Sequence, residues 1–333
     1  MVIQCYDFSS FLPLDTDPQR PGCPAVTTSP GDTLAQVLAG AHARGVPRVD
    51  AQMLLLHALG HAPHDRAWLI AHDADALPVE AARRFEVLVQ RRLGNEPVAY
   101  LTGVKEFFGL QLQVDARVLD PRPDTEALVV WALEVLGARN DAAPDAPGGP
   151  LGLVDLGTGS GAIALAVKHA RPDVQVTAVD ASAGALAVAQ GNAARLRLPV
   201  RFIEGSWLDN VSGHYHVIVA NPPYIAAGDP HLAALIHEPL AALASGQDGL
   251  DDIRLIIRQA PAHLLPGGWL LLEHGWDQSE SVHALLEEAG FTAVQSRSDL
   301  AGILRCTGGH WPQTLAAGSP NTATPDGHGR KVK

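Results

Sequence analysis

The stretch Val154-Asp155-Leu156-Gly157-Thr158-Gly159-Ser160-Gly161 decides the fold class of this chain. An apolar run, residues 151–156, leads into it, and a helical pattern over residues 162–169 follows at once. Glycines at a junction of this kind let the backbone pass close to a ligand, and the amino end of the helix offers unpaired N–H groups. Asp180 ends the next strand-like run, where an acidic side chain can accept hydrogen bonds from ribose hydroxyls. The stretch therefore predicts a bound nucleotide-like cofactor.

The identity of that cofactor is less sharply determined by the turn itself. Gly157, Gly159 and Ala162 satisfy the G-x-G-x-x-G/A fingerprint of dinucleotide-binding proteins, which leaves NAD as an alternative. Asp155 stands two residues before the first of these glycines. A carboxylate there can reach the amino group of an amino-acid moiety and hold the turn, which favours an adenosylmethionine-type cofactor.

Strand-like and helical patterns alternate around this turn. The strand-like runs are residues 151–156, 175–179, 200–203, 216–220 and 269–272, and the helical runs are residues 162–169, 185–196, 250–264 and 279–289. Such alternation predicts an α/β fold, a parallel sheet with helices on both faces. Two last runs, residues 292–297 and 302–306, are too close together for a helical crossover and should pair antiparallel.

The chain ahead of the sheet predicts a second, smaller unit. Apolar residues recur at spacings of three and four over residues 33–43, 49–59 and 79–93, with Gly/Pro breakers between these helical segments. Residues around Gly109 alternate as in a β-hairpin, and Asp124 or Thr125 is placed to cap a later helix. We therefore expect a disordered extension over residues 1–31, a helical domain over 32–99, a β-hairpin linker over 100–120, the α/β domain over 121–307 and a disordered tail over 308–333.

The run over residues 216–220 ends in Asn221-Pro222-Pro223-Tyr224, at the edge where open α/β sheets bind ligands. A planar NH2 group conjugated to a carbonyl or a ring is a poor nucleophile, because its lone pair is delocalised. The Asn221 side-chain oxygen and the Pro222 carbonyl can each accept one of its N–H bonds and stabilise the developing positive charge. The prolines stiffen the loop, and Tyr224 can lie flat against the planar group. This tetrad predicts methyl transfer to a planar nitrogen, with Asn221, Pro222 and Tyr224 as the catalytic residues.

Methyl transfer of this kind is an in-line displacement at a sulfonium carbon of a cofactor that is already a strong electrophile. Positioning and preorganised acceptors should supply most of the acceleration, so we expect no general-base residue. A NAD-dependent oxidoreductase would leave the Asn-Pro-Pro-Tyr tetrad unexplained, and a scaffold without activity would not need an intact Asn221.

Composition and charge restrict the classes of partner. The 333-residue chain has a formal net charge of −12, which argues against a protein that grips nucleic acid through its phosphates, and against a DNA or RNA amino-methyltransferase. Its three cysteines are scattered and fit neither a disulfide framework nor a CxxC metal site. We see no signal peptide and no apolar stretch long enough for a membrane span. We expect a soluble, cytoplasmic monomer.

Three histidines resemble a metal cluster. His57 and His61 are one helical turn apart, and His64 follows the helix-breaking segment from Gly60 to Pro63. No carboxylate joins them at ligand spacing, so we interpret them as a solvated helix end and expect no metal site.

At these motifs the chain resembles the HemK/PrmC family of protein-(glutamine-N5) methyltransferases, from about Thr33 to Cys306. Asn-Pro-Pro-Tyr is shared with DNA adenine methyltransferases, so the Pro-Arg-Pro-Asp-Thr-Glu stretch at residues 121–126 makes the resemblance more specific. The remaining segments that carry it are residues 96–103 (Glu-Pro-Val-Ala-Tyr-Leu-Thr-Gly), 155–161, 238–243 (Glu-Pro-Leu-Ala-Ala-Leu) and 272–275 (Leu-Glu-His-Gly).

The resemblance implies an N-terminal helical domain that helps to recognise a release factor, and a Rossmann-like, seven-stranded methyltransferase domain. The implied cofactor is S-adenosyl-L-methionine. The implied substrate is the Gly-Gly-Gln motif of class I peptide chain release factors, whose glutamine would be methylated at the side-chain amide nitrogen N5, modulating translation termination.

The resemblance also implies the functional residues by their positions. Trp207 would border the adenine, unless it is an ordinary buried aromatic. Arg122 would help to close the site, unless it is a salt-bridged surface residue. The glutamine amide would be bound by Asn221, Pro222, Pro223 and Tyr224. The cofactor would be held by Gly157, Thr158, Gly159, Ser160, Gly161, Asp180, Trp207 and Asn221.

Overall fold

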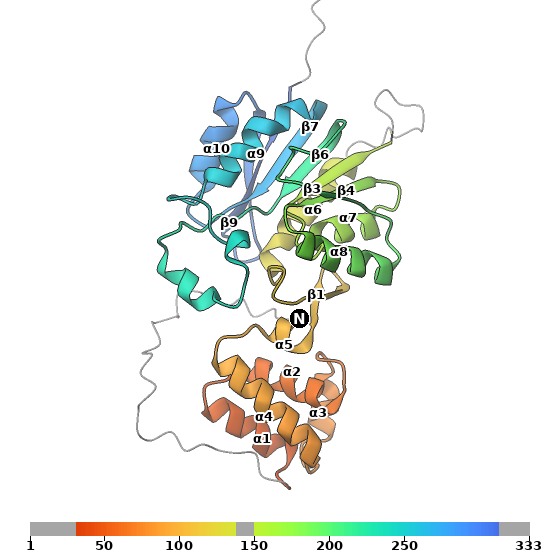
Figure 1. The fold of residues 1–333 in the computed structure, drawn as a ribbon, viewed down its shortest axis with the longest axis vertical. Helices are drawn as coiled ribbons and strands as arrows, with labels where there is room; N and C mark the ends of the chain where they lie inside the picture. The colour runs from red at the N-terminus through yellow and green to blue at the C-terminus, as the bar shows by residue number, and fades with distance from the viewer. Residues whose placement is uncertain (1–30, 138–149, 313–333) are drawn as a thin grey trace, which may run out of the picture.

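The computed structural model describes residues 31–137 and 150–312, with a helical region at one end of the molecule and an α/β region at the other (Figure 1). Residues 1–30 and 313–333, which contain most of the predicted extension and tail, lie outside this description. A β-hairpin connects the two regions, as Figure 1 shows.

The helical region is built from amphipathic segments around one apolar core. Thr33 caps its first helix in a capping box with Gln36. On the longest helix, Ala81, Phe85 and Val89 recur at helical spacing and are buried. All three predicted helices are present, and two short ones were missed. The helices are α1 (Leu34–Ala43), α2 (Arg48–Leu59), α3 (Arg66–Ala71), α4 (Val79–Leu93) and α5 (Val98–Thr102).

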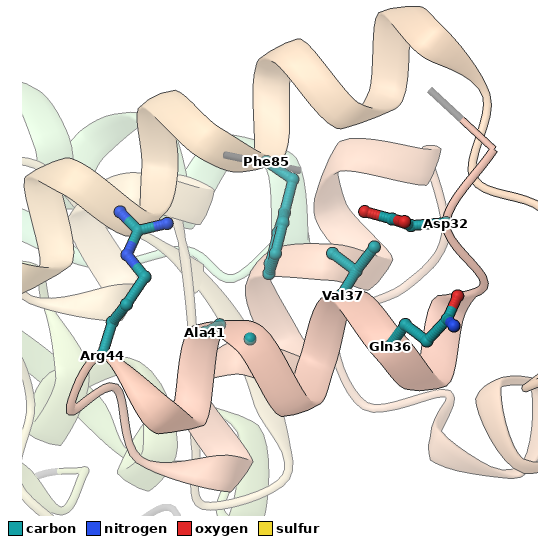
Figure 2. Close-up of a pocket in the computed structure, with 7 residues that line it drawn as sticks. Asp32, Gln36, Val37, Ala41, Arg44 and Phe85 are labelled. Atoms are coloured by element: carbon teal, nitrogen blue, oxygen red, sulfur yellow. The ribbon is translucent and has the colours of Figure 1, made fainter. Parts of the chain in front are cut away.

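A small pocket lies in this region between α1 and α4 (Figure 2). Val37 and Phe85 line its middle, and Asp32 and Arg44 lie at its two ends. Arg44 also forms an ion pair with Glu86, at 2.8 Å. The pocket is remote from the glycine-rich turn and the Asn-Pro-Pro-Tyr segment, which belong to the other region.

The connecting hairpin pairs β1 (Val104–Phe107) with β2 (Leu110–Gln113). Phe108 and Gly109 both have positive φ, as in the tight hairpin turns that match strand twist. Buried Asn192 ties this hairpin to the α/β region: its side chain accepts from Gln113 N–H at 2.7 Å and donates to the carbonyls of Gln113 and Ser160. The same amide therefore links the hairpin with the glycine-rich turn.

The α/β region contains the predicted, mostly parallel seven-stranded sheet, in the order β5-β4-β3-β6-β7-β9-β8. The two last strands pair antiparallel, as predicted. The strands are β3 (Gly152–Leu156), β4 (Gln175–Asp180), β5 (Arg201–Glu204), β6 (Tyr215–Ala220), β7 (Leu264–Glu273), β8 (Thr292–Ser298) and β9 (Leu304–His310). The helices are α6 (Glu126–Gly137), α7 (Ala162–Ala170), α8 (Ala183–Leu196), α9 (Asp251–Gln259) and α10 (Ser279–Glu288).

Helices cover both faces of this sheet, so its central strands are apolar on both sides. One core lies between the sheet and α6, α7 and α8, and a second lies between the opposite face and α9 and α10. Every residue of β6 is buried, including His216. The layers in Figure 1 follow this division.

Two boundaries and one helix cap differ from the sequence predictions. The tail was expected to begin at Gly308, but β9 continues to His310, because two glycines let Phe291 and Trp131 pack directly on the strand. The helix expected to reach residue 264 ends at Gln259 and gives way to a 3-10 turn that contains Pro261. Asp124 and Thr125 do not cap α6, because they belong to the 3-10 turn Pro123–Thr125 that runs into it.

Strand register brings the key positions to one edge of the sheet. Leu156 is paired with Val179 on one side and with Ala220 on the other, and Ala220 is paired with Leu272. The chain changes direction between β3 and β6, the kind of switch point at which open α/β sheets bind ligands. The next positions share this edge: Gly157, Asp180, Asn221 and Glu273.

Among the described residues, no helix has the length and apolar character needed to cross a membrane.

Candidate active site

The glycine-rich turn after β3 has a backbone that only glycine adopts easily. Gly157, Gly159 and Gly161 all have positive φ, at 70°, 55° and 85°. A Cβ at Gly157 would lie 3.1 Å from the Trp207 ring, whereas nothing lies within 4 Å of a Cβ at Gly159. The backbone of the turn is therefore closely packed at its first glycine and open at its second.

The buried side chain of Asp155 stabilises this turn through hydrogen bonds. Its Oδ2 accepts from the Thr158 hydroxyl at 2.6 Å and from the Ala164 N–H at 3.2 Å. Its Oδ1 is buried and has no hydrogen-bond partner in the described part of the chain. Burial raises the pKa of Asp155 to about 7, although its bonds to Thr158 and Ala164 oppose that rise. This carboxylate oxygen therefore keeps its capacity to accept a hydrogen bond.

Replacing Asp155 with asparagine should change how stability depends on pH. The folded-state pKa, about 7, lies above the unperturbed value of 3.8. The stability from Asp155 is therefore complete below the unperturbed pKa and is lost as pH rises through the folded pKa. The variant stays neutral, so its free energy of unfolding should gain about 2–3 kcal/mol relative to wild type between pH 5 and pH 8. Urea unfolding at several pH values measures this difference.

A difference that stays constant with pH would contradict this environment for Asp155. Glu273, whose pKa burial also raises to about 7, is present in both proteins, so its titration cancels in the comparison.

Asp180 is drawn into the same turn. Its Oδ2 accepts from the Gly159 N–H at 2.8 Å and its Oδ1 from the Ser182 N–H at 2.9 Å. A carboxylate oxygen can accept more than one hydrogen bond, so both oxygens keep acceptor capacity. The structure thus brings Asp180 to the turn, as the sequence suggested.

Trp207 packs across the turn from the loop after β5. Its backbone has positive φ, 49°, an uncommon conformation for a bulky residue. Its indole Nε1 donates to Asp252 Oδ1 at 3.1 Å. Its ring edge lies against Gly157. Trp207 is half-buried, so one aromatic surface borders the turn while its polar end is anchored in α9.

The Asn-Pro-Pro-Tyr segment leaves β6 beside this turn. Asn221 is half-buried, and its Nδ2 donates to Thr125 Oγ1 at 3.1 Å. Pro222 and Pro223 are buried. The Tyr224 hydroxyl is 3.4 Å from Glu273 Oε1, a long hydrogen bond. With its nitrogen engaged by Thr125, the Asn221 amide has its oxygen left as an acceptor.

Glu273 and Thr125 are members of this cluster that sequence reasoning did not select. Glu273 ends β7 and is 1% exposed, and Thr125 is 4% exposed. Both lie within segments that carry the family resemblance, and this was the signal available in the sequence. Their contacts join positions far apart in the chain, so no local pattern reveals them.

Arg122 is held by acidic residues. Its guanidinium pairs with Glu238 at 2.6 Å and with Asp120 at 3.5 Å. Glu238 Oε2 also accepts from the Asp120 N–H at 3.1 Å. Arg122 is therefore salt-bridged but half-buried, and it fastens the segment before Thr125 to the loop that contains Glu238.

His57, His61 and His64 resembled a metal cluster in the sequence. His61 stacks on Trp68, with ring centroids 3.9 Å apart. Among residues 31–137 and 150–312, no group of three or more His, Cys, Asp or Glu side chains is placed to hold a metal ion.

The fold and this edge of the sheet define a Rossmann-like, S-adenosylmethionine-dependent methyltransferase. Residues 150–295 match the family described as methyltransferase small domain, and residues 33–103 match the PrmC N-terminal domain. The catalytic domain of hMettl16, solved in complex with the MAT2A 3′UTR hairpin 6, shares the fold, with a TM-score of 0.50 and 15% identity over 65% of this chain and 80% of that one.

Curated relatives narrow the class to one family. A release factor glutamine methyltransferase of Bordetella pertussis is 50% identical over 272 residues, 80% of this chain and 96% of the relative. One of Burkholderia pseudomallei is 44% identical over 296 residues, 86% of this chain and 99% of the relative. The chain belongs to the HemK/PrmC family of release factor glutamine methyltransferases.

Proposed function

We propose that this chain transfers a methyl group from S-adenosylmethionine to the side-chain amide nitrogen of the glutamine in the Gly-Gly-Gln motif of class I release factors. The observation that carries the proposal is the orientation of the Asn221 amide. Its nitrogen donates to Thr125 Oγ1 at 3.1 Å, which leaves its oxygen as the acceptor for a substrate. A glutamine NH2 group needs such an acceptor. Family membership supports a release factor as the substrate.

The residues of the turn fit the proposed cofactor. The open space at Gly159 and the unpartnered Asp155 Oδ1 suit a ligand that carries an amino group. Asp180 keeps acceptor capacity for ribose hydroxyls, and the half-buried Trp207 ring offers an apolar surface for adenine. We therefore assign cofactor binding to residues 157–161, Asp180 and Trp207, with Asn221 at the junction to the substrate.

Asn221 and Pro222 would activate the substrate nitrogen. The cofactor, when bound, supplies an electrophilic methyl group on a sulfonium. The Asn221 Oδ1 and the Pro222 carbonyl would each accept one N–H of the glutamine amide, which orients the nitrogen and stabilises its developing charge. Buried Pro222 and Pro223 fix these acceptors before the substrate arrives. Tyr224 would flank the planar amide, and the surplus proton would leave to water.

The helical region would help to recognise the release factor. It contacts the catalytic region at the Gly94 carbonyl, which lies 2.7 Å from His237 Nε2. His237 directly precedes Glu238 in the chain. A substrate bound across the two regions would therefore touch a segment connected through Arg122 to Thr125. We propose a cytoplasmic monomer that acts on protein; the net charge of −12 supports the absence of a nucleic-acid substrate.

Mass spectrometry of an unmethylated release factor, incubated with the chain and S-adenosylmethionine, tests this function. We expect the mass of one methyl group on the peptide that contains Gly-Gly-Gln, located on the glutamine side chain by fragmentation. A release factor with that glutamine replaced by asparagine is the matched control and should gain no methyl. No methyl on the wild-type factor, while adenosylhomocysteine still binds the chain, would overturn the substrate assignment.

A further inference from the structure

We propose that Thr125 is a positioning residue, whose hydroxyl determines which end of the Asn221 amide faces the substrate nitrogen. This inference rests on the proposed function of Asn221. Thr125 is 4% exposed and its hydroxyl accepts from the Asn221 amide, so we expect its effect on catalysis to pass through Asn221.

The contact between Thr125 and Asn221 joins two segments that are far apart in the sequence. Asn221 follows β6, and Thr125 ends the 3-10 turn before α6, 96 positions earlier. The Thr125 N–H donates to the Arg122 carbonyl at 3.2 Å, and Arg122 is anchored to Glu238. Thr125 is therefore held in place by its own turn, independently of Asn221.

The polarity of the contact depends on Glu273. A hydroxyl has one proton to donate and two lone pairs, so it can present either to an amide. Thr125 is among the groups that lower the pKa of Glu273, and Glu273 Oε2 has no hydrogen-bond partner in the described part of the chain. Above its pKa, which burial raises to about 7, Glu273 is a carboxylate and only accepts. It attracts the Thr125 proton, and the oxygen lone pairs are left for Asn221.

Several groups surround this carboxylate. The Tyr224 hydroxyl donates to Glu273 Oε1 at 3.4 Å, and Arg305 favours the charged form of Glu273 while Asp124 opposes it. Cys306 is paired with Glu273 in the neighbouring strand, and burial raises the pKa of its thiol, so it stays neutral. Thr125 is the neighbour that joins this carboxylate to Asn221.

The consequence is a fixed amide. With an acceptor at Thr125, the NH2 end of Asn221 turns toward it and the carbonyl oxygen turns the other way, where a glutamine N–H needs an acceptor. Without the hydroxyl, the two orientations related by a half-turn of the amide become similar in energy. The wrong orientation presents a donor to a donor and cannot activate the substrate.

The test compares Thr125→Val, which keeps the shape and removes the hydroxyl, with Thr125→Ser, which keeps the hydroxyl. For methylation of a release factor we expect Thr125→Val to lower kcat about tenfold, with the KM for S-adenosylmethionine changed less than threefold. Thr125→Ser should recover most of the lost kcat. Adenosylhomocysteine binding and the melting temperature of both variants show that the fold is intact.

A second readout does not need activity. In protein labelled with 15N at asparagine, the Asn221 side-chain NH2 resonances are assigned by their absence from Asn221→Asp. We expect them to move in Thr125→Val toward the values of solvated amides and to stay in place in Thr125→Ser. If wild type does not methylate a release factor, the proposed function fails, and this readout still decides the inference.

Unmoved resonances in Thr125→Val would overturn the inference, and so would a kcat within twofold of wild type. Equal losses of kcat in both variants would also overturn it, because they would indicate a packing role and not a hydroxyl. A loss confined to Thr125→Val, with moved resonances, would support it.

Discussion

Replacing Asn221 with alanine should lower kcat for release-factor methylation by about 10²–10³-fold, the usual effect of removing one preorganised group that meets charge developing in a transition state. The variant keeps the glycine-rich turn and Trp207, so we expect adenosylhomocysteine to bind with an affinity within a few-fold of wild type. Asn221 is half-buried at the end of a strand, and truncating it should leave the sheet intact. Single-turnover methylation and calorimetric titration measure the two quantities.

The matched control is Asn221→Asp. Aspartate keeps an acceptor oxygen at nearly the same place and loses the donor to Thr125, so it should retain more activity than alanine. If alanine reduces kcat less than tenfold, the Asn221 oxygen is not the acceptor that activates the substrate. If both variants lose cofactor affinity together with kcat, Asn221 acts mainly on the cofactor.

The sequence could predict the features of the fold that local patterns determine. Glycines at a strand end and alternating apolar runs predicted the strand–turn–helix at β3 and the parallel sheet. The sequence prediction ended β9 too early, because Gly308 and Gly309 look like a loop. In the structure a Cβ on either glycine would collide with side chains across the sheet. Long-range packing therefore overrode the local signal.

In the candidate site, too, residues that belong to a local sequence pattern were predictable and residues brought together by long-range packing were not. Asn221 was predictable, because a polar residue before two prolines at a strand end is a local pattern. Glu273 was not selected, because a lone glutamate after an apolar run resembles any strand end. Only the pairing of β7 with β6 puts its carboxylate next to Thr125 and Tyr224. Register between strands far apart in sequence produces this cluster.

Replacing Gly157 with valine should weaken adenosylhomocysteine binding about 10- to 100-fold. Gly157 has φ of 70°, a conformation that costs a β-branched residue of the order of 1–3 kcal/mol. Its Cβ would also lie 3.1 Å from the Trp207 ring, so the ring must shift from the turn. A turn that relaxes in the free protein must be forced back when the ligand binds, and each 1.4 kcal/mol of that cost lowers the affinity tenfold. Isothermal titration calorimetry measures the change.

Gly213→Val separates this effect from a general loss of stability. Gly213 has φ of 91° and nothing within 4 Å of a Cβ, and it precedes β6 at the edge of the sheet opposite the turn. Its valine variant carries a comparable backbone strain without a neighbour at the cofactor site. It should lower the free energy of unfolding and leave adenosylhomocysteine affinity unchanged. Wild-type affinity in Gly157→Val would show that the cofactor does not depend on this turn, and equal weakening in both variants would show that strain anywhere in the domain is sufficient.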